Sequence, residues 1–420
     1  MTSNSKLVTT SREIPNHFLE SIKIQYDWEL AYKQDTDNFW VSYQKELKNI
    51  VHGSIRSTRQ SNNKFLFESD QGFKLDIQEN LNHIKIGCEK YTTNIYSPYQ
   101  VHKVLNGKKR IMSMGVSSMG ELGVYGSTDG ILEVFEISDG QVRRKLDGHA
   151  GDVDFSMFFP SGTVILSGAG DGRLKIWDAL DGSCAQTLVG HTGGIISASL
   201  VDRGRNIVSA SRDGTSKLWD VPSASVIHTL CKLSRPVNDC FVASSLLEST
   251  NNTGEKTDER EVGTQGKTVV LAAEEGFLQI YDLRSKNMVS QLDIPLLSEQ
   301  TRPVAFNACH VHNSLIVGGD HVGNIYLWDK RNLSTPFSRL QFSNSPIHHI
   351  KSNTSAKSSN SFWVTSGDGS VFLLDLDKNS ITTSLSGIDT DVVTSFNVVK
   401  DMAFTTSRDS IIRCYNKLNL

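Results

Sequence analysis

Two short stretches of the sequence hold side chains that can do chemistry. In the first, Asp213 follows two serines, Ser209 and Ser211, and His191 lies upstream. Serine, histidine and aspartate are the residue types of a nucleophilic triad, in which histidine activates the hydroxyl and aspartate orients the histidine. The stretch is therefore either a catalytic site or a structural hydrogen-bond network, and the elements that position it must decide.

The second stretch, Cys309-His310-Val-His312 with His321 downstream, offers a thiolate and imidazoles, which are zinc ligands. Cys309 and His310 are adjacent, so on a strand their side chains point to opposite faces. No second cysteine or pair of carboxylates stands nearby in the sequence. We therefore expect histidines at a strand end here, and no metal or cofactor site.

The chain contains seven similar segments. Each has a turn, commonly Asp-Gly, and then a run that ends in a large residue; these residues are Phe135, Trp177, Trp219, Tyr281, Trp328, Leu374 and Tyr415. The intervals between them are 42, 42, 62, 47, 46 and 41 residues. The short intervals match the ~40–45 residues of a propeller blade made of four strands.

Each segment also has the local chemistry of short antiparallel strands. Asp-Gly favours a tight turn because glycine accepts a positive φ, and β-forming residues such as Val164–Leu166 precede the turn. One such unit cannot bury its faces alone, so seven must close into a ring. The sequence predicts an all-β fold, a seven-bladed β-propeller.

Gly148-His149 and Gly190-His191 precede two of the segments, as in the WD40 repeats that these segments resemble. In that family a histidine, a serine, an aspartate and a tryptophan form one buried hydrogen-bond chain in each blade. The resemblance implies two such tetrads, His149, Ser167, Asp171 and Trp177, and His191, Ser209, Asp213 and Trp219, with Ser211 as an alternative to Ser209. Because the set recurs in consecutive blades, we interpret it as structural and expect no catalytic residue.

The repeat also predicts the domain organisation. Residues 1–85 form a small N-terminal β-rich domain, and residues 86–420 form the propeller. The last blade needs a fourth strand from elsewhere, and residues 89–96 have the β-branched and aromatic content for that closing strand. The long interval holds a polar, charged insertion, at about residues 244–268, which we expect to be disordered.

Composition and charge limit the partners. The 43 basic and 46 acidic residues leave a net charge of −3, which does not favour the basic face that nucleic acid demands. No apolar run is long enough to span a bilayer, and the six scattered cysteines lack CxxC spacing. We expect a monomer with free thiols in the cytoplasm and nucleus, which binds neither nucleic acid nor membranes.

Candidate contacts for a protein partner fall in two groups. The first group lies just before the turns or at the starts of the first strands, on one rim of the ring, and comprises Asp152, Asp154, Arg212, Asp239, Glu274, His321, Asp391 and Arg408. The second group is Asp202, Arg203 and Arg205 of the turn Asp-Arg-Gly-Arg-Asn. These arginines either form ion pairs within the turn or offer guanidinium groups to a partner carboxylate.

The run from Phe158-Phe-Pro-Ser-Gly through Leu188-Val-Gly-His to Asp202-Arg-Gly-Arg-Asn and Ser-Ala-Ser-Arg-Asp-Gly resembles the proteasomal ATPase-associated factors. These are WD40 chaperones of proteasome regulatory-particle assembly. The resemblance implies a protein that is not an enzyme. It implies binding to the C-terminal domain of an AAA ATPase subunit of the proteasome base during assembly of the 26S regulatory particle.

An alternative is a substrate receptor of a cullin-type ubiquitin ligase. Such receptors use a Trp-Asp-x-Arg pattern to contact the ligase adaptor, and Trp328-Asp-Lys-Arg331 has this pattern; Tyr281-Asp-Leu-Arg284 resembles it less well. An arginine at that position can also pair within its own loop, so the pattern alone does not decide.

Overall fold

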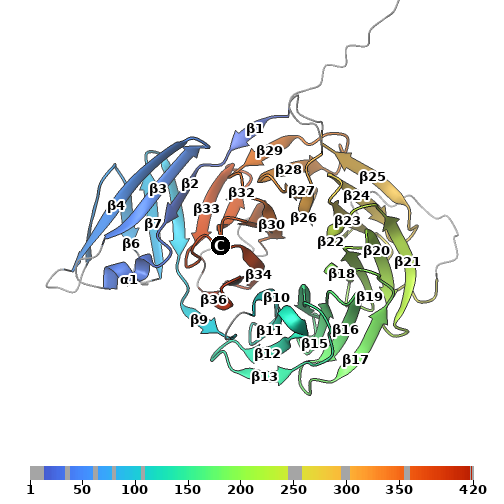
Figure 1. The fold of residues 1–420 in the computed structure, drawn as a ribbon. Coiled ribbons are helices and arrows are strands. Elements are labelled where there is room, and N and C mark those ends of the chain that lie inside the picture. Colours follow the sequence, from blue (N-terminus) through green and yellow to red (C-terminus); the bar gives the residue numbers. More distant parts are fainter. Residues whose placement is uncertain are drawn as a thin grey trace, which may run out of the picture.

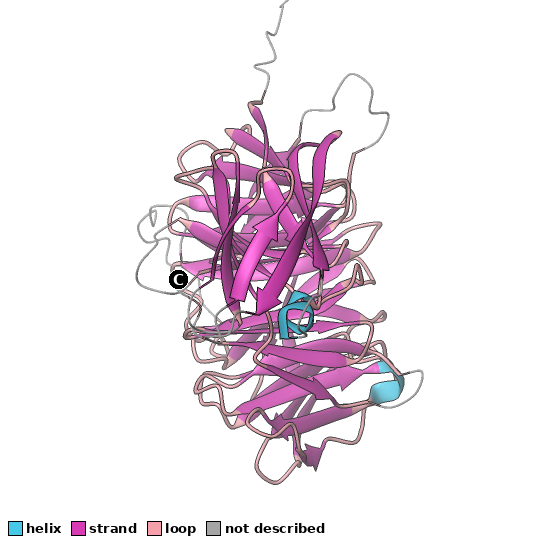
Figure 2. Ribbon diagram, turned by 90° about the vertical axis from the view of Figure 1, so that its left-hand side faces the viewer, coloured by secondary structure: helices cyan, strands magenta, loops and turns pink. Residues whose placement is uncertain are grey.

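The structure is a computed structural model that describes residues 14–33, 38–59, 65–77, 82–105, 109–244, 258–294, 303–353, 360–416 and 418. Almost every element in these ranges is a β-strand (Figure 2). Seven sheets surround a central opening, and an eighth sheet lies beside the ring (Figure 1). The predicted all-β, seven-bladed propeller is confirmed.

Blades 1 to 4 each have four antiparallel strands that follow one another in the chain. From the centre outwards, these strands are β10 (Ile111–Val116), β11 (Leu122–Ser127), β12 (Leu132–Glu136) and β13 (Val142–Lys145); β14 (Phe155–Phe158), β15 (Val164–Gly168), β16 (Arg173–Asp178) and β17 (Cys184–Val189); β18 (Ile195–Val201), β19 (Asn206–Ser211), β20 (Thr215–Asp220) and β21 (Ser225–Lys232); and β22 (Val237–Ser244), β23 (Lys267–Ala273), β24 (Phe277–Asp282) and β25 (Met288–Asp293). A 3-10 turn, η1 (Thr128–Gly130), links β11 to β12.

Blades 5 to 7 recruit strands from the N-terminal part of the chain. Their own strands are β26 (Phe306–His312), β27 (Leu315–Asp320), β28 (Asn324–Asp329) and β29 (Ser338–Gln341); β30 (Ile347–Ser352), β31 (Ser361–Ser366), β32 (Val371–Asp375) and β33 (Ser380–Leu385); and β34 (Val393–Val399), β35 (Met402–Ser407) and β36 (Ile411–Tyr415). The strand β1 (Asn16–Phe18) adds a fifth, parallel strand to blade 5 by pairing with β29.

The closing strand differs from the prediction. The strand β9 (Gln100–Lys103), and not residues 89–96, pairs antiparallel with β36 and completes blade 7. Residues 89–96 do form a strand, β8 (Tyr91–Tyr96), but β8 pairs in parallel with β33, the outer strand of blade 6. Both segments can form strands, and only their pairing partners decide which one closes the ring.

The N-terminal part packs against blade 6. A sheet of β2 (Ser21–Ile24), β3 (Asn38–Glu46), β4 (Asn49–Arg59) and β5 (Phe65–Ser69) lies beside a second group of strands, β6 (Lys74–Ile77), β7 (His83–Cys88) and β8, which extends blade 6 to seven strands. The helix α1 (Trp28–Lys33) follows β2. Tyr43 of β3 stacks on Tyr91 of β8 with ring centroids 6.0 Å apart, so both sheets share one apolar core with blades 5 and 6. The boundary expected at residue 85 falls inside β7.

Part of the insertion falls within the described residues. Residues 245–257 lie outside the described residues, but residues 258–267 have a defined path, so the expectation of disorder is wrong for this part. Elsewhere, apolar cores fill the spaces between neighbouring blades; Trp219 of blade 3, for example, belongs to one core with Leu166 and Ile176 of blade 2. Within the described ranges, no helix is long and apolar enough to cross a membrane.

Candidate functional site

The serine, histidine and aspartate residues form two matching hydrogen-bond chains, one in blade 2 and one in blade 3. In blade 3, His191 Nδ1 lies 2.9 Å from Asp213 Oδ2, and His191 Nε2 lies 2.7 Å from Ser209 Oγ. The Trp219 indole N–H donates to the same hydroxyl at 2.8 Å. In blade 2 the corresponding distances, through His149, Asp171, Ser167 and Trp177, are 3.0, 2.7 and 2.8 Å.

The environment of these chains is that of a structural network. Ser209 is fully buried, and its hydroxyl contacts both the imidazole and the indole, so no substrate reaches it. Burial lowers the pKa of His191 and keeps the imidazole neutral. Burial acts to raise the pKa of Asp213, but hydrogen bonds from Thr215, the Thr192 amide and His191 outweigh it and hold that pKa well below its usual value.

The structure distinguishes the two candidate serines. Ser209 lies in the chain, whereas the Ser211 hydroxyl donates to the carbonyl oxygens of Gly193 and Gly194 at 3.1 and 3.0 Å. Ser211 therefore ties the turn after β19 to the loop before β18 and takes no part in the tetrad.

The second stretch, on β26, brings no ligands together. The Cys309 thiol donates to the carbonyl of Val270 at 3.3 Å, while His310 Nε2 accepts the N–H of Ser352 at 3.1 Å. The two side chains thus reach neighbouring blades on opposite sides. In the part of the chain that the structure describes, no group of three histidine, cysteine, aspartate or glutamate side chains is placed to hold a metal ion.

The first group of candidate contacts lies where loops of successive blades meet. Arg212 donates to Asp154 at 2.9 Å between blades 3 and 2, and Asp152 accepts the Asp129 N–H at 3.2 Å. Glu274 lies 4.0 Å from Arg235. His321 and Arg408 are exposed and Asp391 is half-buried. These residues belong to one rim of mixed charge.

Two aspartates of this group are not exposed on the rim. The Asp154 side chain is 7% exposed beside Arg212, and the placement of Asp239 on the exposed rim is wrong. Its carboxylate accepts the Ser197 hydroxyl at 2.7 Å and the Cys309 N–H at 3.0 Å, so it joins the inner strands of blades 3, 4 and 5. Burial raises its pKa. The pairing of β22 is irregular between Val237 and Asp239, and the carboxylate faces the neighbouring inner strands, so its role is to link blades.

The second group lies on the other face of the ring. Asp202–Arg205 connect β18 to the start of β19, whereas Arg212 follows the end of β19. One strand therefore separates the two groups, and a single flat partner surface cannot contact both. In the turn, Asp202 pairs with Lys267 at 2.8 Å, and Arg205 Nε lies 3.8 Å from Asp220. The Arg203 side chain is exposed.

The ordered part of the insertion packs directly on this turn. The buried Asn206 side chain donates to the carbonyls of Trp219 and Arg260, both at 3.0 Å, and accepts the N–H of Val262 at 2.6 Å. Arg260 in turn donates to Ser225 Oγ at 2.8 Å. The turn and residues 258–267 therefore form one rigid surface across blades 3 and 4, which the polar composition of the insertion did not indicate.

The Trp-Asp-x-Arg pattern has a local explanation. Arg331 Nε donates to Asp329 Oδ1 at 2.9 Å, two residues earlier in its own loop. At the weaker match, Asp282 Oδ1 accepts the backbone N–H groups of Arg284 and Ser285. Both aspartates thus stabilise their own turns. This local role accounts for the pattern without a ligase adaptor.

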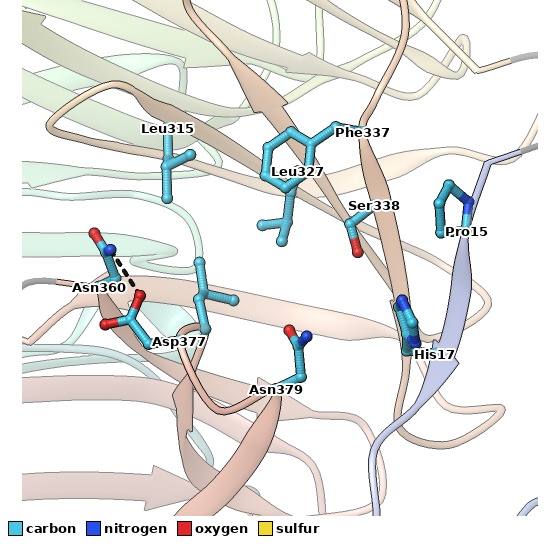
Figure 3. A pocket seen from close by; sticks show the side chains of 10 residues that line it. Pro15, His17, Leu315, Leu327, Phe337, Ser338, Asn360, Asp377 and Asn379 are labelled. Carbon is cyan, nitrogen blue, oxygen red and sulfur yellow. Dashed lines mark hydrogen bonds between the residues drawn. The ribbon is translucent and has the colours of Figure 1, made fainter.

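A cavity of about 390 Å³ lies between blades 5 and 6, beside β1 (Figure 3). Leu315, Leu327 and Phe337 give it apolar walls, and Asn360 donates to Asp377 at its edge at 3.0 Å. Sequence reasoning missed this cavity because its walls come from both ends of the chain, Pro15 and His17 among them.

Comparison with known proteins agrees with this geometry. Residues 140–178 and 182–220 match the family model described as WD domain, G-beta repeat, and these two stretches include both tetrads, from His149 to Trp177 and from His191 to Trp219. The seven-bladed ring and its tetrads define the class of the protein, a WD40-repeat propeller.

The relatives extend over nearly the whole chain. A Dictyostelium discoideum protein, the "Probable proteasomal ATPase-associated factor 1", is 69% identical over 422 residues, which cover 98% of this chain and 99% of that protein. The human "Proteasomal ATPase-associated factor 1" is 39% identical over 405 residues, with 95% and 99% covered, and the Gallus gallus protein of that name is 39% identical over 400 residues, with 94% and 98% covered. The chain belongs to the proteasomal ATPase-associated factor 1 family, as the resemblance in the sequence implied.

Proposed function

We propose that this protein is a non-catalytic chaperone that binds the C-terminal domain of an ATPase subunit of the proteasome base and assists assembly of the regulatory particle. The names of its relatives, which associate them with proteasomal ATPases, support an ATPase partner. The proposal includes a monomeric protein that acts in the cytoplasm and nucleus.

The observation that carries this proposal is the rigid turn of blade 3. Arg203 and Arg205 extend from a turn that the Asp202–Lys267 ion pair and the side chain of Asn206 join to residues 258–267, and the Arg205 side chain is 52% exposed. Guanidinium groups held in place bind carboxylates with two hydrogen bonds and lose little side-chain freedom on binding. A surface of this kind suits a protein that covers a partner and later releases it.

The test is retention of proteasome subunits from cell extract by the tagged full-length protein, identified by mass spectrometry. We expect base ATPase subunits with little core particle. The double variant Arg203→Ala/Arg205→Ala should retain at most about one fifth of the ATPase that the wild type retains. Truncating an interface arginine often costs more than about 1 kcal/mol of binding free energy. The matched control is Arg235→Ala/Arg408→Ala, which removes two exposed arginines from the opposite rim and should bind as the wild type does.

Two other outcomes are informative. Retention of a cullin and its adaptor without ATPase subunits would overturn the proposal. Retention of ATPase subunits that is reduced by the rim variant and not by the turn variant would move the contact to the opposite face. Thermal unfolding of each variant shows whether a loss of binding reflects a loss of folded protein.

A further inference from the structure

A second surface, which we call the junction groove, lies where the N-terminal sheet meets blade 6. Its walls come from β2 and β3 on one side and from β32, β33 and the loop after β33 on the other. Figure 1 shows the N-terminal sheet beside blade 6. The apolar floor includes Ile22, Phe342 and Phe372, all buried. The polar and aromatic lining above it includes Lys23, Tyr26, Trp40, Asp368 and Asp389.

Two aromatic side chains stand open in this groove. Trp40 is 48% exposed and Tyr26 is 41% exposed. The other five tryptophans are at most 1% exposed, so Trp40 is the exception among six. Exposing an indole in water is unfavourable, and tryptophan and tyrosine are the residues that most often dominate protein interfaces. An indole face also attracts cations, arginine above all.

The charges in the groove are unbalanced toward acid. Lys23 pairs with Asp368 at 2.6 Å, and its ammonium lies 5.5 Å from the centre of the Phe342 ring. Lys23 is the one cationic side chain of this lining, and its charge is already neutralised by Asp368. Asp389 is exposed, and none of the described cationic side chains lies within 4.0 Å of its carboxylate. Asp391 follows two residues later, which adds a further negative charge beside the groove.

The walls are held rigidly, so the groove exists before a partner binds. The Trp28 indole N–H donates to Ser386 Oγ at 2.9 Å and joins α1 to blade 6. The backbone of Trp40 is fixed on both sides, since its carbonyl accepts the Gln25 N–H at 3.1 Å and its N–H donates to Gln25 Oε1 at 3.3 Å. Pre-organisation lowers the entropy cost of binding.

We propose that the junction groove binds an arginine-bearing segment of the protein partner. The guanidinium lies over the Trp40 ring and pairs with Asp389, and the alkyl part of the arginine covers Ile388 and Tyr26. A carboxylate beside an aromatic face selects arginine over a neutral side chain, because the cation gains from both. This inference rests on the proposed function, since the partner is taken to be the ATPase domain. Asp368 and Asp389 lie on the face of the Asp-Gly turns, opposite to the arginine turn, so the segment that enters the groove is a part of the domain that extends past the edge of the ring.

The test uses the exposed indole as its own reporter. Acrylamide quenching of tryptophan fluorescence is measured for the full-length protein with and without the purified C-terminal domain of the base ATPase subunit that the protein retains. The Trp40→Phe protein, measured in parallel, gives the signal of all other tryptophans, so the difference isolates Trp40. We expect the partner to protect Trp40 from the quencher.

Binding of the same domain is then compared across variants. Trp40→Ala and Asp389→Arg should each raise the Kd about tenfold or more, whereas Trp40→Phe and Asp389→Glu should change it by about twofold or less. Leu180→Ala and Asp401→Arg are the matched controls, since both residues are exposed and lie outside the groove, and their Kd should equal that of the wild type.

The two proposals fail separately. If the wild type binds the ATPase domain while Trp40 stays open to the quencher and the groove variants bind normally, the junction groove is not the contact and the proposed function stands. If the wild type binds no ATPase domain, the proposed function is wrong and the groove inference falls with it.

Discussion

The side-chain amide of Asn206 accepts the backbone N–H of Val262 at 2.6 Å, across 56 residues of chain. Through the same side chain, Asn206 donates to the carbonyl of Arg260 at 3.0 Å. One buried amide thus serves as partner to two backbone groups in residues 258–267 of the insertion, as a neighbouring strand would. The arginine turn and this segment are therefore one structural unit.

Asn206→Ala should release that segment. It leaves the carbonyls of Trp219 and Arg260 and the N–H of Val262 without their partner, and we expect unfolding to become easier by about 2–3 kcal/mol. Hydrogen–deuterium exchange should rise first in residues 258–267. Asn206→Asp keeps the acceptor for Val262 but sets a buried carboxylate oxygen against the carbonyl oxygens of Trp219 and Arg260, so it should cost at least as much as Asn206→Ala. Unchanged exchange in Asn206→Ala would show that the segment is held by other contacts.

The tryptophans of blades 3 and 5 differ in one hydrogen bond. The Trp219 indole N–H donates to Ser209, whereas the equally buried Trp328 indole N–H has no acceptor. The reason is in the sequence, since blade 5 carries Gly318 at the position of Ser209, as the matching strand registers show. The tetrad exists only in the blades whose sequences provide all four members.

This difference predicts unequal costs for the same substitution. Trp219→Phe and Trp328→Phe both replace a buried indole by a smaller phenyl ring. Only the first also breaks a hydrogen bond and disturbs the contacts of His191. We expect Trp219→Phe to destabilise by about 1–2 kcal/mol more than Trp328→Phe in urea unfolding. Equal losses would mean that the tetrad hydrogen bond contributes nothing measurable.

Asp213→Ala tests the other end of the same chain. The carboxylate accepts hydrogen bonds from the Thr192 N–H at 2.9 Å and from Thr215 Oγ, and it contacts His191. Its removal takes away the charged acceptor of the buried imidazole, leaves Thr215 Oγ at 3.0 Å as the remaining contact of His191 Nδ1, and leaves the Thr192 N–H without an acceptor, so we expect a loss of about 2–3 kcal/mol in the free energy of unfolding. Asp181→Ala, a substitution of an exposed turn aspartate in blade 2, is the control and should cost less than about 1 kcal/mol.

These comparisons also show why the sequence was informative about the ring and less so about its surfaces. The blades and tetrads follow from spacing within one repeat, so a local pattern contains them. The closing strand was misplaced because β8 and β9 are both plausible strands and only pairing with β36 separates them. Residues 260 and 262 bond to the distant Asn206 side chain, and Trp40 and Asp389 line one groove from distant parts of the chain; neither arrangement leaves a local signal in the sequence.

Gly204→Ala should strain the arginine turn. Gly204 has φ +89°, and a Cβ there would lie 2.4 Å from Phe159 Cε1, so both the backbone and the neighbouring ring oppose a side chain. We expect a loss of about 2–3 kcal/mol in thermal or urea unfolding. Gly266→Ala is the matched control, because Gly266 has φ +64° with no atom within 4 Å of the added Cβ. It should cost about 1 kcal/mol, and equal losses at both sites would remove Phe159 from the explanation.

Acidification should destabilise the ring through histidines that are buried without charge. Burial lowers the pKa of His310 and of His349 to about 3 each, and neighbouring Lys351 adds to this shift. In the unfolded chain a histidine titrates near ~6.5, so between that pH and about 3 only the unfolded state binds these protons. The stability is therefore fully present above about pH 6.5 and is lost as the pH falls below it.

Lys351 contributes little to this test, because burial lowers its pKa only to about 8, so from pH 7.5 downwards it is mostly protonated in the folded state as well as in the unfolded state. One pKa unit corresponds to about 1.4 kcal/mol, so lowering the pH from 7.5 to 5.5 should cost the wild type about 1 kcal/mol through His310 alone. His310→Gln, which keeps an acceptor for the Ser352 N–H, should lose about 1 kcal/mol less than the wild type over this range. His52→Gln, at an exposed position, should follow the wild type, and parallel pH profiles for all three proteins would exclude His310 as the titrating group.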